Sequence, residues 1–411
     1  MKIEKEAIEL HRKYKGKLEI TCKVPLQNKW DLSLAYTPGV AEVSSKIFNN
    51  PEEVYNLTIK ANSVAVVSDG SAVLGLGNIG PLGALPVMEG KAILFKRFAG
   101  IDAFPICLNT QDPDKIIETI YFLSPTFGGI NLEDISSPRC FYIERKLKEI
   151  LDIPVFHDDQ HGTAVVTLAA LLNALKVRNS KIDEVEVVIL GAGAAGLAIA
   201  EILLHIGVKE IKIVDKHGII YPGRKEGMNE EKERLAQITN PEGKKGSLED
   251  AIKGKDVFIG VSQGKLLTKE LIKKMKKNPI IFAMANPIPE IMPDEAKEAG
   301  AKIIGTGRSD FPNQINNLLA FPGIFRGALI VRAKEINLEM KISASYAISE
   351  LVEDPHENYL VPSPLDKRVV PEVALRVAES AIATKTARII KTKEEIRKDI
   401  LEALGGSHEV L

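Results

Sequence analysis

Four carboxylates gather in two short segments of the chain, and they are the residues best suited to do chemistry. Glu133 and Asp134 form one pair, and Asp158 and Asp159 form the other. A hard divalent cation such as Mg²⁺ or Mn²⁺ prefers oxygen ligands of this kind, with water or substrate oxygens completing its coordination. Taken alone, each pair has an ordinary explanation, because Glu-Asp is common on solvated surfaces and Asp-Asp often caps a helix.

The segment around the second pair predicts where these acids lie. The apolar run at residues 153–156 predicts a strand that ends beside His157. Because α/β proteins bind ligands at the carboxyl ends of strands, we expect Asp158 and Asp159 at such a site. Successive residues of an extended chain point to opposite sides, so we expect the two aspartates to have different roles. His157 and His161 lack a third ligand at suitable spacing, which makes zinc a weaker candidate.

Two glycine strings of the form GxGxxG occur, at residues 75–80 and 191–196, and their surroundings separate them. The second follows the β-rich run EVVIL, opens an apolar helix, and is trailed by Asp215 at the end of the next expected strand. Small residues there let backbone amides at a helix N-terminus approach a pyrophosphate, and the acid can bind ribose hydroxyls. The first string lacks such an acid, so we expect it to be a turn that shapes the substrate cleft. The expected cofactor loop is Gly191, Ala192, Gly193, Ala194, Ala195 and Gly196.

The cofactor is therefore expected to be NAD or NADP. A carboxylate at Asp215 repels a 2′-phosphate and favours NAD, whereas the nearby Lys216, His217 and Arg224 could accommodate that phosphate. The sequence favours NAD only weakly.

The elements that must position these segments predict an α/β fold in three parts. Residues 1–160 alternate β-rich runs with amphipathic segments and form the expected substrate and catalytic domain. Residues 161–335 are expected to form a Rossmann-type domain with a doubly wound parallel sheet, because several buried-strand candidates follow the βαβ unit. Residues 336–411 carry amphipathic helical patterns and are expected to return and pack on the first domain.

Composition narrows the class of protein further. Hydrophobic residues make up 45% and charged residues 27% of the chain, with a formal net charge of -1, which argues against a nucleic-acid binder or a membrane protein. The charged N-terminus lacks the apolar core of a signal peptide. Cys22, Cys107 and Cys140 are far apart and form no CxxC pair. We therefore expect a cytoplasmic protein with a small-molecule substrate and no nucleic-acid or membrane partner.

Three longer stretches together resemble the malic enzyme family. They are SLAYTPGVA at 33–41, GLGNIGPLGALPVMEGKAILFK at 75–96 and HDDQHGTA at 157–164. Asn286 in MANP and Asn316-Asn317 in NQINNLLAFPG match as well. The resemblance runs from about residue 15 to about residue 385 and is to the short, single-function prokaryotic form of the family.

This resemblance implies an activity and its catalytic groups. It implies oxidative decarboxylation of malate to pyruvate and carbon dioxide with reduction of NAD or NADP, and a side activity on oxaloacetate. It implies Tyr36 as general acid, Lys91 as general base, and Asp158 as the partner that positions this lysine. It also implies a homo-oligomer, a dimer or larger.

The resemblance further implies the ligands of metal and substrate. The implied ligands of Mg²⁺ or Mn²⁺ are Glu133, Asp134 and Asp159. The implied substrate residues are Asn286, which also borders the cofactor, and Asn317, with Asn316 as a neighbouring candidate. One departure stands out, because Ser71-Ala72 replace an arginine that grips a malate carboxylate in larger relatives.

Two other functions remain compatible with parts of the sequence. A metal-independent hydroxy-acid or amino-acid dehydrogenase would also use the dinucleotide loop and a lysine, although the carboxylate cluster argues against it. A catalytically inactive dinucleotide sensor would share the fold, because fold alone does not fix function. Such a sensor would not require Tyr36, Lys91 and the four acids.

Overall fold

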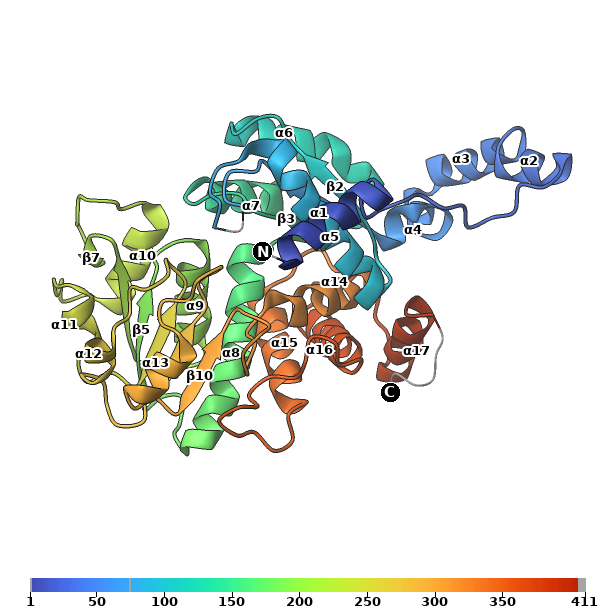
Figure 1. The fold of residues 1–411 in the computed structure, drawn as a ribbon. Helices are drawn as coiled ribbons and strands as arrows, with labels where there is room; N and C mark the ends of the chain where they lie inside the picture. The colour runs from blue at the N-terminus through green and yellow to red at the C-terminus, as the bar shows by residue number, and fades with distance from the viewer. Residues whose placement is uncertain (1, 74, 406–411) are drawn as a thin grey trace.

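Two sheets, each surrounded by helices, form the body of the protein in a computed structural model that describes residues 2–73 and 75–405 (Figure 1). One sheet has four strands and the other has six. Among the described strands, one neighbouring pair at the edge of the larger sheet is antiparallel and the other pairs are parallel. The mixed α/β fold with a Rossmann-like second sheet, which the sequence predicted, is confirmed.

The first sheet is assembled from short apolar runs separated by helices. Its strands are β1 (Ser63–Ser68), β2 (Asp102–Cys107), β3 (Gly129–Leu132) and β4 (Val155–His157), in the spatial order β2-β1-β3-β4. The helices that cover it are α5 (Gly80–Ala99), α6 (Pro113–Leu123) and α7 (Arg139–Ile150). Side chains alternate along β1, so Val64 packs with the core on the side of α5 and Val67 packs with the core of α6 and α7. Helices on both faces bury the sheet, as is usual for parallel strands.

The second sheet follows the doubly wound pattern. Its strands are β5 (Glu186–Leu190), β6 (Glu210–Asp215), β7 (Gly218–Ile219), β8 (Val257–Gly260), β9 (Ile280–Ala283) and β10 (Ile303–Thr306), in the order β10-β9-β8-β5-β6-β7. Its helices are α9 (Ala194–His205), α10 (Glu230–Thr239), α11 (Leu248–Ile252), α12 (Lys269–Ile272) and α13 (Pro293–Glu298). The strand order reverses between β5 and β8, and open α/β sheets bind ligands at the carboxyl ends of strands beside such a reversal. The edge strand β7 is too short to show any alternation in the sequence.

A single helix, α8 (Asp158–Arg178), connects the two sheets, and its start corrects one prediction. The sequence placed Asp158 and Asp159 on an extended chain. In the structure β4 ends at His157, so both aspartates lie in the first turn of α8. Their side chains point in different directions because successive helical residues are rotated by about 100°, not because a strand alternates.

The chain returns to the first sheet through four helices. They are α14 (Phe321–Ile330), α15 (Leu338–Glu350), α16 (Val369–Ala383) and α17 (Lys393–Ala403). Buried Arg326 of α14 donates from Nε to the carbonyl oxygen of Ala99 at 2.9 Å and from a terminal nitrogen to Oδ1 of Asn62 at 2.6 Å. In the described part of the chain, no helix has the length and apolar character needed to cross a membrane.

The N-terminal segment has two parts with different surroundings. After α1 (Lys2–Tyr14), the backbone N–H of Lys17 donates to Glu89 of α5 at 3.1 Å, which ties this part to the body. The following α2 (Lys29–Ala35) and α3 (Gly39–Asn49) project away from both sheets (Figure 1). Neither helix buries a side chain. We call residues 18–50 the arm.

Candidate active site

A cleft of about 850 Å³ lies between the part of the chain that carries the first sheet and the part that carries the second. Its walls come from α5, from the segments that follow β3, β8 and β9, and from the beginnings of α8 and α9. It brings together most of the residues that the sequence singled out. These are Lys91, Glu133, Asp134, Asp159, Ala194, Ala195, Asn286, Asn316 and Asn317.

Lys91 projects from α5 into the cleft and is held by two carboxylates. Its Nζ lies 2.6 Å from Oδ2 of Asp158 and 3.0 Å from Oε1 of Glu133. The same ammonium lies 4.1 Å from the centre of the Phe321 ring. Asp158 is fully buried behind the lysine and also accepts a hydrogen bond from Nδ2 of Asn317 at 2.5 Å. These contacts fix the direction of the lysine side chain.

The two carboxylates also keep a proton on the lysine. Burial alone would lower the pKa of Lys91, but the charges of Asp158 and Glu133 outweigh burial and raise that pKa above its ordinary value. Burial raises the pKa of Asp158 to about 6, against the opposing effect of Lys91. Lys91 is therefore an ammonium group in this arrangement. Neutralising one of the two carboxylates would lower the pKa of Lys91 and ease the loss of this proton.

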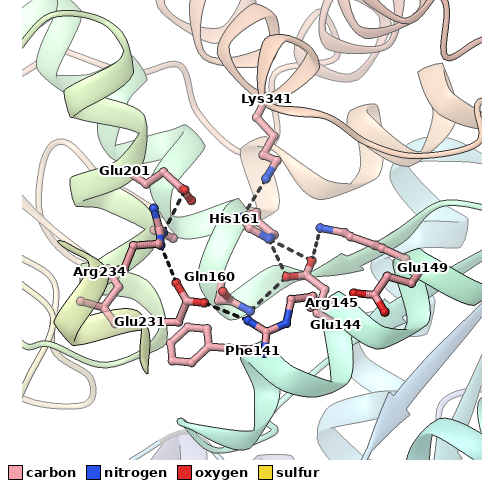
Figure 2. A pocket seen from close by; sticks show the side chains of 13 residues that line it. Phe141, Glu144, Arg145, Glu149, Gln160, His161, Glu201, Glu231, Arg234 and Lys341 are labelled. Carbon is pink, nitrogen blue, oxygen red and sulfur yellow. Dashed lines mark hydrogen bonds and ion pairs between the residues drawn. The ribbon is translucent and has the colours of Figure 1, made fainter. Parts of the chain in front are cut away.

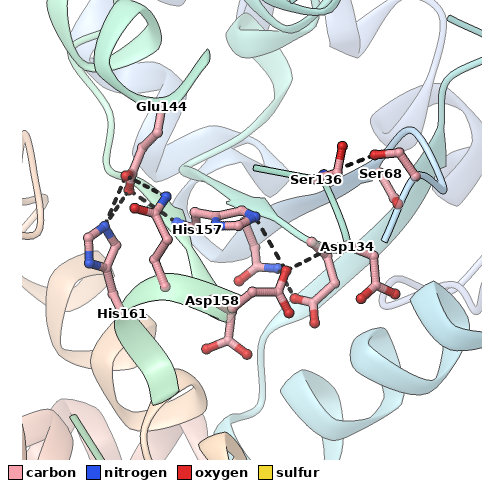
Figure 3. Close-up of polar contacts among 12 residues, drawn as sticks. Ser68, Asp134, Ser136, Glu144, His157, Asp158 and His161 are labelled. Atoms are coloured by element: carbon pink, nitrogen blue, oxygen red, sulfur yellow. Dashed lines mark hydrogen bonds and ion pairs between the residues drawn. The ribbon is translucent and has the colours of Figure 1, made fainter. Parts of the chain in front are cut away.

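Three acids form a compact cluster beside the lysine. Glu133, Asp134 and Asp159 each offer a carboxylate oxygen, and these oxygens lie within 4.8 Å of one another. In Figure 3, Asp134 follows β3, and Asp158 opens α8 directly after the neighbouring strand β4. Burial, followed by the charges of Asp159 and Glu133, raises the pKa of Asp134 to about 9. Such crowding of like charges is relieved when a cation binds between them.

Backbone geometry at Asp134 supports the same interpretation. Its φ of 54° lies in the left-handed region, which a non-glycine residue occupies at some cost, and such strain clusters at functional sites. Its backbone N–H donates to Oδ2 of Asp159 at 2.8 Å. Its own Oδ2 is buried and accepts no hydrogen bond from the described residues. The three acids therefore fit a hard divalent cation.

The glycine loop between β5 and α9 has the geometry of a pyrophosphate cradle. Gly191 has φ +120°, and a Cβ there would lie 2.7 Å from the carbonyl oxygen of Val261. A Cβ on Gly196 would lie 1.7 Å from the carbonyl oxygen of Gly191, so this position packs the helix against the strand. A Cβ on Gly193 would have no neighbour within 4 Å, which leaves room for a ligand at the N-terminus of α9. These are the three roles that the motif assigns to its glycines.

Asp215 lies at the end of β6, where the sequence placed it, but its carboxylate is already occupied. Oδ1 accepts from the backbone N–H of His217 at 2.9 Å and from Arg224 at 2.9 Å. Oδ2 accepts from Arg224 at 2.5 Å and from Lys232 at 2.8 Å. Burial opposes ionisation, yet Arg224 and Lys232 lower the pKa of Asp215 to about 2. All four lone-pair sites of the carboxylate are used, and its charge is neutralised.

Sequence reasoning missed two residues that shape the cleft, one in its wall and one buried behind its loops. Lys17 reaches the cleft wall from the segment after α1, where its Nζ donates to the carbonyl oxygen of Pro86 at 2.6 Å. Glu290 is fully buried and accepts the backbone N–H of Ser262 at 2.9 Å and of Ala285 at 3.1 Å. Glu290 thereby fixes two loops that line the cleft. Neither residue has a spacing or motif in the sequence that marks it.

Of the expected catalytic residues, Lys91 lines this cleft and Asp158 is buried directly behind it, whereas Tyr36 does not line it. It follows α2 in the arm, and its exposed fraction is 67%. The described residues of the same chain therefore assemble the lysine, the acids and the dinucleotide loop without this phenol.

Models of two domains match the chain. Residues 15–148 match the N-terminal domain of malic enzyme, and residues 160–383 match the NAD-binding domain of malic enzyme. The bifunctional malic/malolactic enzyme of Bacillus subtilis is 59% identical over 398 residues, which cover 96% of this chain and 97% of that protein. The NAD-dependent malic enzyme of Geobacillus stearothermophilus is 57% identical over 376 residues, which cover 91% of this chain and 78% of that protein.

A solved structure agrees over both halves of the molecule. The malic enzyme of Pyrococcus horikoshii superimposes with a TM-score of 0.93 at 48% sequence identity, and the match covers 98% of this chain and 96% of that one. The similarity therefore includes the sheets, the connecting helix and the C-terminal helices.

Proposed function

The chain belongs to the malic enzyme family and oxidatively decarboxylates malate to pyruvate and carbon dioxide with NAD or NADP, and we propose that Lys91 is its general base. The observation that carries this proposal is the meeting of a buried lysine, three acids and a dinucleotide loop around one cleft. Lys91 takes the proton of the 2-hydroxyl group as hydride leaves C2 for the nicotinamide. Asp158 is the positioning residue that holds the lysine from behind.

Glu133, Asp134 and Asp159 are proposed to hold Mg²⁺ or Mn²⁺. Three observations support this assignment. All three residues offer carboxylate oxygens, these oxygens lie within 4.8 Å of one another, and Oδ2 of Asp134 has no hydrogen-bond partner among the described residues. A divalent cation held by these three acids would supply Lewis-acid chemistry to the substrate, which would favour the loss of carbon dioxide. Neutralising Glu133 would also leave Lys91 with one charged partner and ease the release of its proton. Asn286 and Asn317 also line the cleft and are proposed to orient the substrate.

Lys17 is proposed to bind the second carboxylate of malate, where Ser71-Ala72 replace the arginine of larger relatives. The charge of Lys91 is already paired with two carboxylates. Lys17 borders the same cleft, and its ammonium donates to a carbonyl oxygen, so its charge remains available to a carboxylate of the substrate. We expect Lys17→Met to raise KM for malate about tenfold and to leave kcat within about threefold, because it removes ground-state binding. Steady-state kinetics at saturating cofactor measure both values.

The matched control for this prediction is Lys13→Met, which removes an exposed lysine near the end of α1. It should leave KM for malate unchanged. An unchanged KM in Lys17→Met as well would show that another group binds the carboxylate.

The cofactor preference is proposed to be for NAD, by a small factor. The negative charge at the end of β6 favours NAD, and the Geobacillus relative is NAD-dependent. However, Arg224 and Lys232 neutralise Asp215, so the repulsion of a 2′-phosphate is weak. Exposed Lys216 and His217 follow directly and can approach such a phosphate. We therefore expect both dinucleotides to support turnover.

The arm is proposed to dock on a second copy of the chain and to bring Tyr36 to its partner's cleft. It exposes many large apolar side chains that its own chain leaves uncovered, including Trp30 at 71% and Phe48 at 85%. Exposed apolar patches of this kind mark protein interfaces. A second copy suits this surface because each cleft lacks the acid that each arm carries. Two-fold symmetry would then complete both sites at once.

A reducing, cytoplasmic location is also proposed. The structure pairs none of the three cysteines in a disulfide, and Cys140 is buried. Disulfides are rare in the cytosol, so unpaired thiols are compatible with this location.

The test of the proposed function is an assay of malate with NAD and, separately, with NADP. Each reaction is run with Mn²⁺ and with a chelator, while pyruvate and carbon dioxide are quantified. We expect metal-dependent reduction of the dinucleotide with an equal amount of pyruvate, at a somewhat higher kcat/KM for NAD. Reduction that yields oxaloacetate and survives chelation would instead identify a simple dehydrogenase and overturn the site assignment.

A further inference from the structure

A second cavity, of about 480 Å³, lies away from the acid cluster and between helices of different parts of the chain. Its lining comes from α7 of the first sheet, α8, α9 and α10 beside the second sheet, and α15 of the C-terminal return (Figure 2). We call it the interdomain pocket. It shares no lining residue with the cleft that holds the acids and the dinucleotide loop.

The floor of the interdomain pocket is a buried chain of three groups. Lys341 of α15 donates to Nδ1 of His161 at 3.0 Å. The other ring nitrogen of His161 donates to the carboxylate of Glu144, with both oxygens at 2.9 Å. Figure 2 shows this chain running from α15 through α8 to α7. The histidine is neutral in this arrangement, because one nitrogen accepts and the other donates.

The carboxylates of the pocket already have partners. Glu144 lies 2.8 Å from Nζ of Lys148 and also accepts the hydrogen bond of His161. Glu231 pairs with Arg145 at 3.5 Å and with Arg234 at 3.0 Å. A cationic ligand would therefore find these carboxylates already paired with basic side chains.

Lys341 is the exception among the charged groups of the interdomain pocket. Its exposed fraction is 8%, and a neutral imidazole nitrogen is the partner that the described residues give it. An ammonium group can donate three hydrogen bonds, and burying it without an opposite charge is costly. Burial lowers its pKa to about 8, and the nearby Lys148 contributes to the shift. Glu144, Glu201 and Glu335 raise this pKa from a distance, but no carboxylate of the described residues forms an ion pair with the ammonium, so a direct negative partner is left to a ligand.

The apolar part of the pocket wall indicates that a ligand of Lys341 also carries a hydrocarbon group. Phe141, Leu197 and Ala198 line it beside the charged groups. A dianion such as phosphate would bring two charges to one ammonium and leave this apolar wall uncovered. A monoanion with a short hydrocarbon body would neutralise Lys341 and cover the apolar wall.

We propose that the interdomain pocket is a binding site for a small monocarboxylate, whose carboxylate pairs with Lys341 and whose hydrocarbon part packs on Phe141 and Leu197. The site touches the catalytic helix, because His161 lies one turn after Asp158 on α8. Glu144 also accepts the backbone N–H of His157 at 3.2 Å, directly before that helix. A ligand on Lys341 therefore contacts the segment that carries Asp158 and Asp159.

Butyrate is the probe for this proposal, and inorganic phosphate is the comparison. Calorimetric titration of the full chain without malate should show butyrate binding with a dissociation constant on the order of 1 mM and no binding of phosphate in that range. Lys341→Met should weaken butyrate binding at least tenfold. The matched control, Lys115→Met, removes an exposed lysine of α6 that does not line the pocket and should leave binding unchanged.

A second variant keeps the test decisive if Lys341→Met does not fold. Ala198→Leu fills the pocket from α9 while keeping every charge, and it should also abolish butyrate binding. Absence of butyrate binding in the natural chain overturns the proposal. So does butyrate binding that persists in a folded Lys341→Met or Ala198→Leu, because the anion would then occupy the cleft or the surface. Neither result depends on turnover, so the proposed function is tested separately.

Discussion

Lys91→Met is expected to lower kcat by about 10²- to 10⁴-fold, because the substitution removes the group proposed to accept the proton of the 2-hydroxyl group. This loss corresponds to about 3 to 5 kcal/mol of transition-state stabilisation. Methionine keeps most of the length of the lysine side chain over Phe321. The measurement is the rate of dinucleotide reduction at saturating malate, metal and cofactor, together with the dissociation constant of the cofactor, which should not change.

Stability must be measured beside activity in this variant. Removing the ammonium leaves Asp158 and Glu133 buried without their shared cation, and breaking a buried pair is strongly destabilising. The melting temperature in the presence of Mn²⁺ therefore accompanies each rate. Lys96→Met is the control, because it removes a half-exposed lysine from the same helix. A folded Lys91→Met enzyme with the kcat of the natural chain would exclude Lys91 as the base.

Most of the sheet framework could be predicted from local sequence. The run SVAVVS is β-rich along its whole length, and it forms β1 from Ser63 to Ser68 in the structure. The dinucleotide loop was recognisable because its glycines, the strand before it and the helix after it agree. The start of α8 was misjudged because the helix begins directly at the end of β4, without a loop residue to mark the change.

The acid cluster was predictable because its members follow strand ends, which parallel pairing brings to one edge of the sheet. Other features of the site depend on contacts that local sequence does not encode. Lys17 meets Pro86, 69 residues later in the chain, and Glu290 meets Ser262 across two loops. Asp215 is neutralised by Arg224 and Lys232, whose approach depends on how the segment after β6 folds. Sequence reasoning supplied the acid but not its partners.

Tyr36 is largely exposed in the single chain, so the contacts proposed for it must come from a second copy. We expect Tyr36→Phe to lower kcat by about 10²-fold or more, since the enol formed after decarboxylation would lose its proton donor. The variant keeps the ring and removes only the hydroxyl group, so the arm should still dock. Replacing the exposed Tyr14 by phenylalanine is the control and should leave kcat unchanged. Rates at saturating substrates measure both variants.

Mixed dimers decide whether Tyr36 serves its own chain or its partner. If the arm crosses to the second copy, a dimer of one Tyr36→Phe chain and one Lys91→Met chain contains one site with both native groups and one with neither. Co-expression of the two inactive variants should then restore about a quarter of the natural activity, because half of the dimers are mixed and each has one working site. If Tyr36 served its own chain, each site of the mixed dimer would lack one group, and no activity would return. Recovery therefore depends on the arm crossing between subunits, a property that no single-chain variant can report.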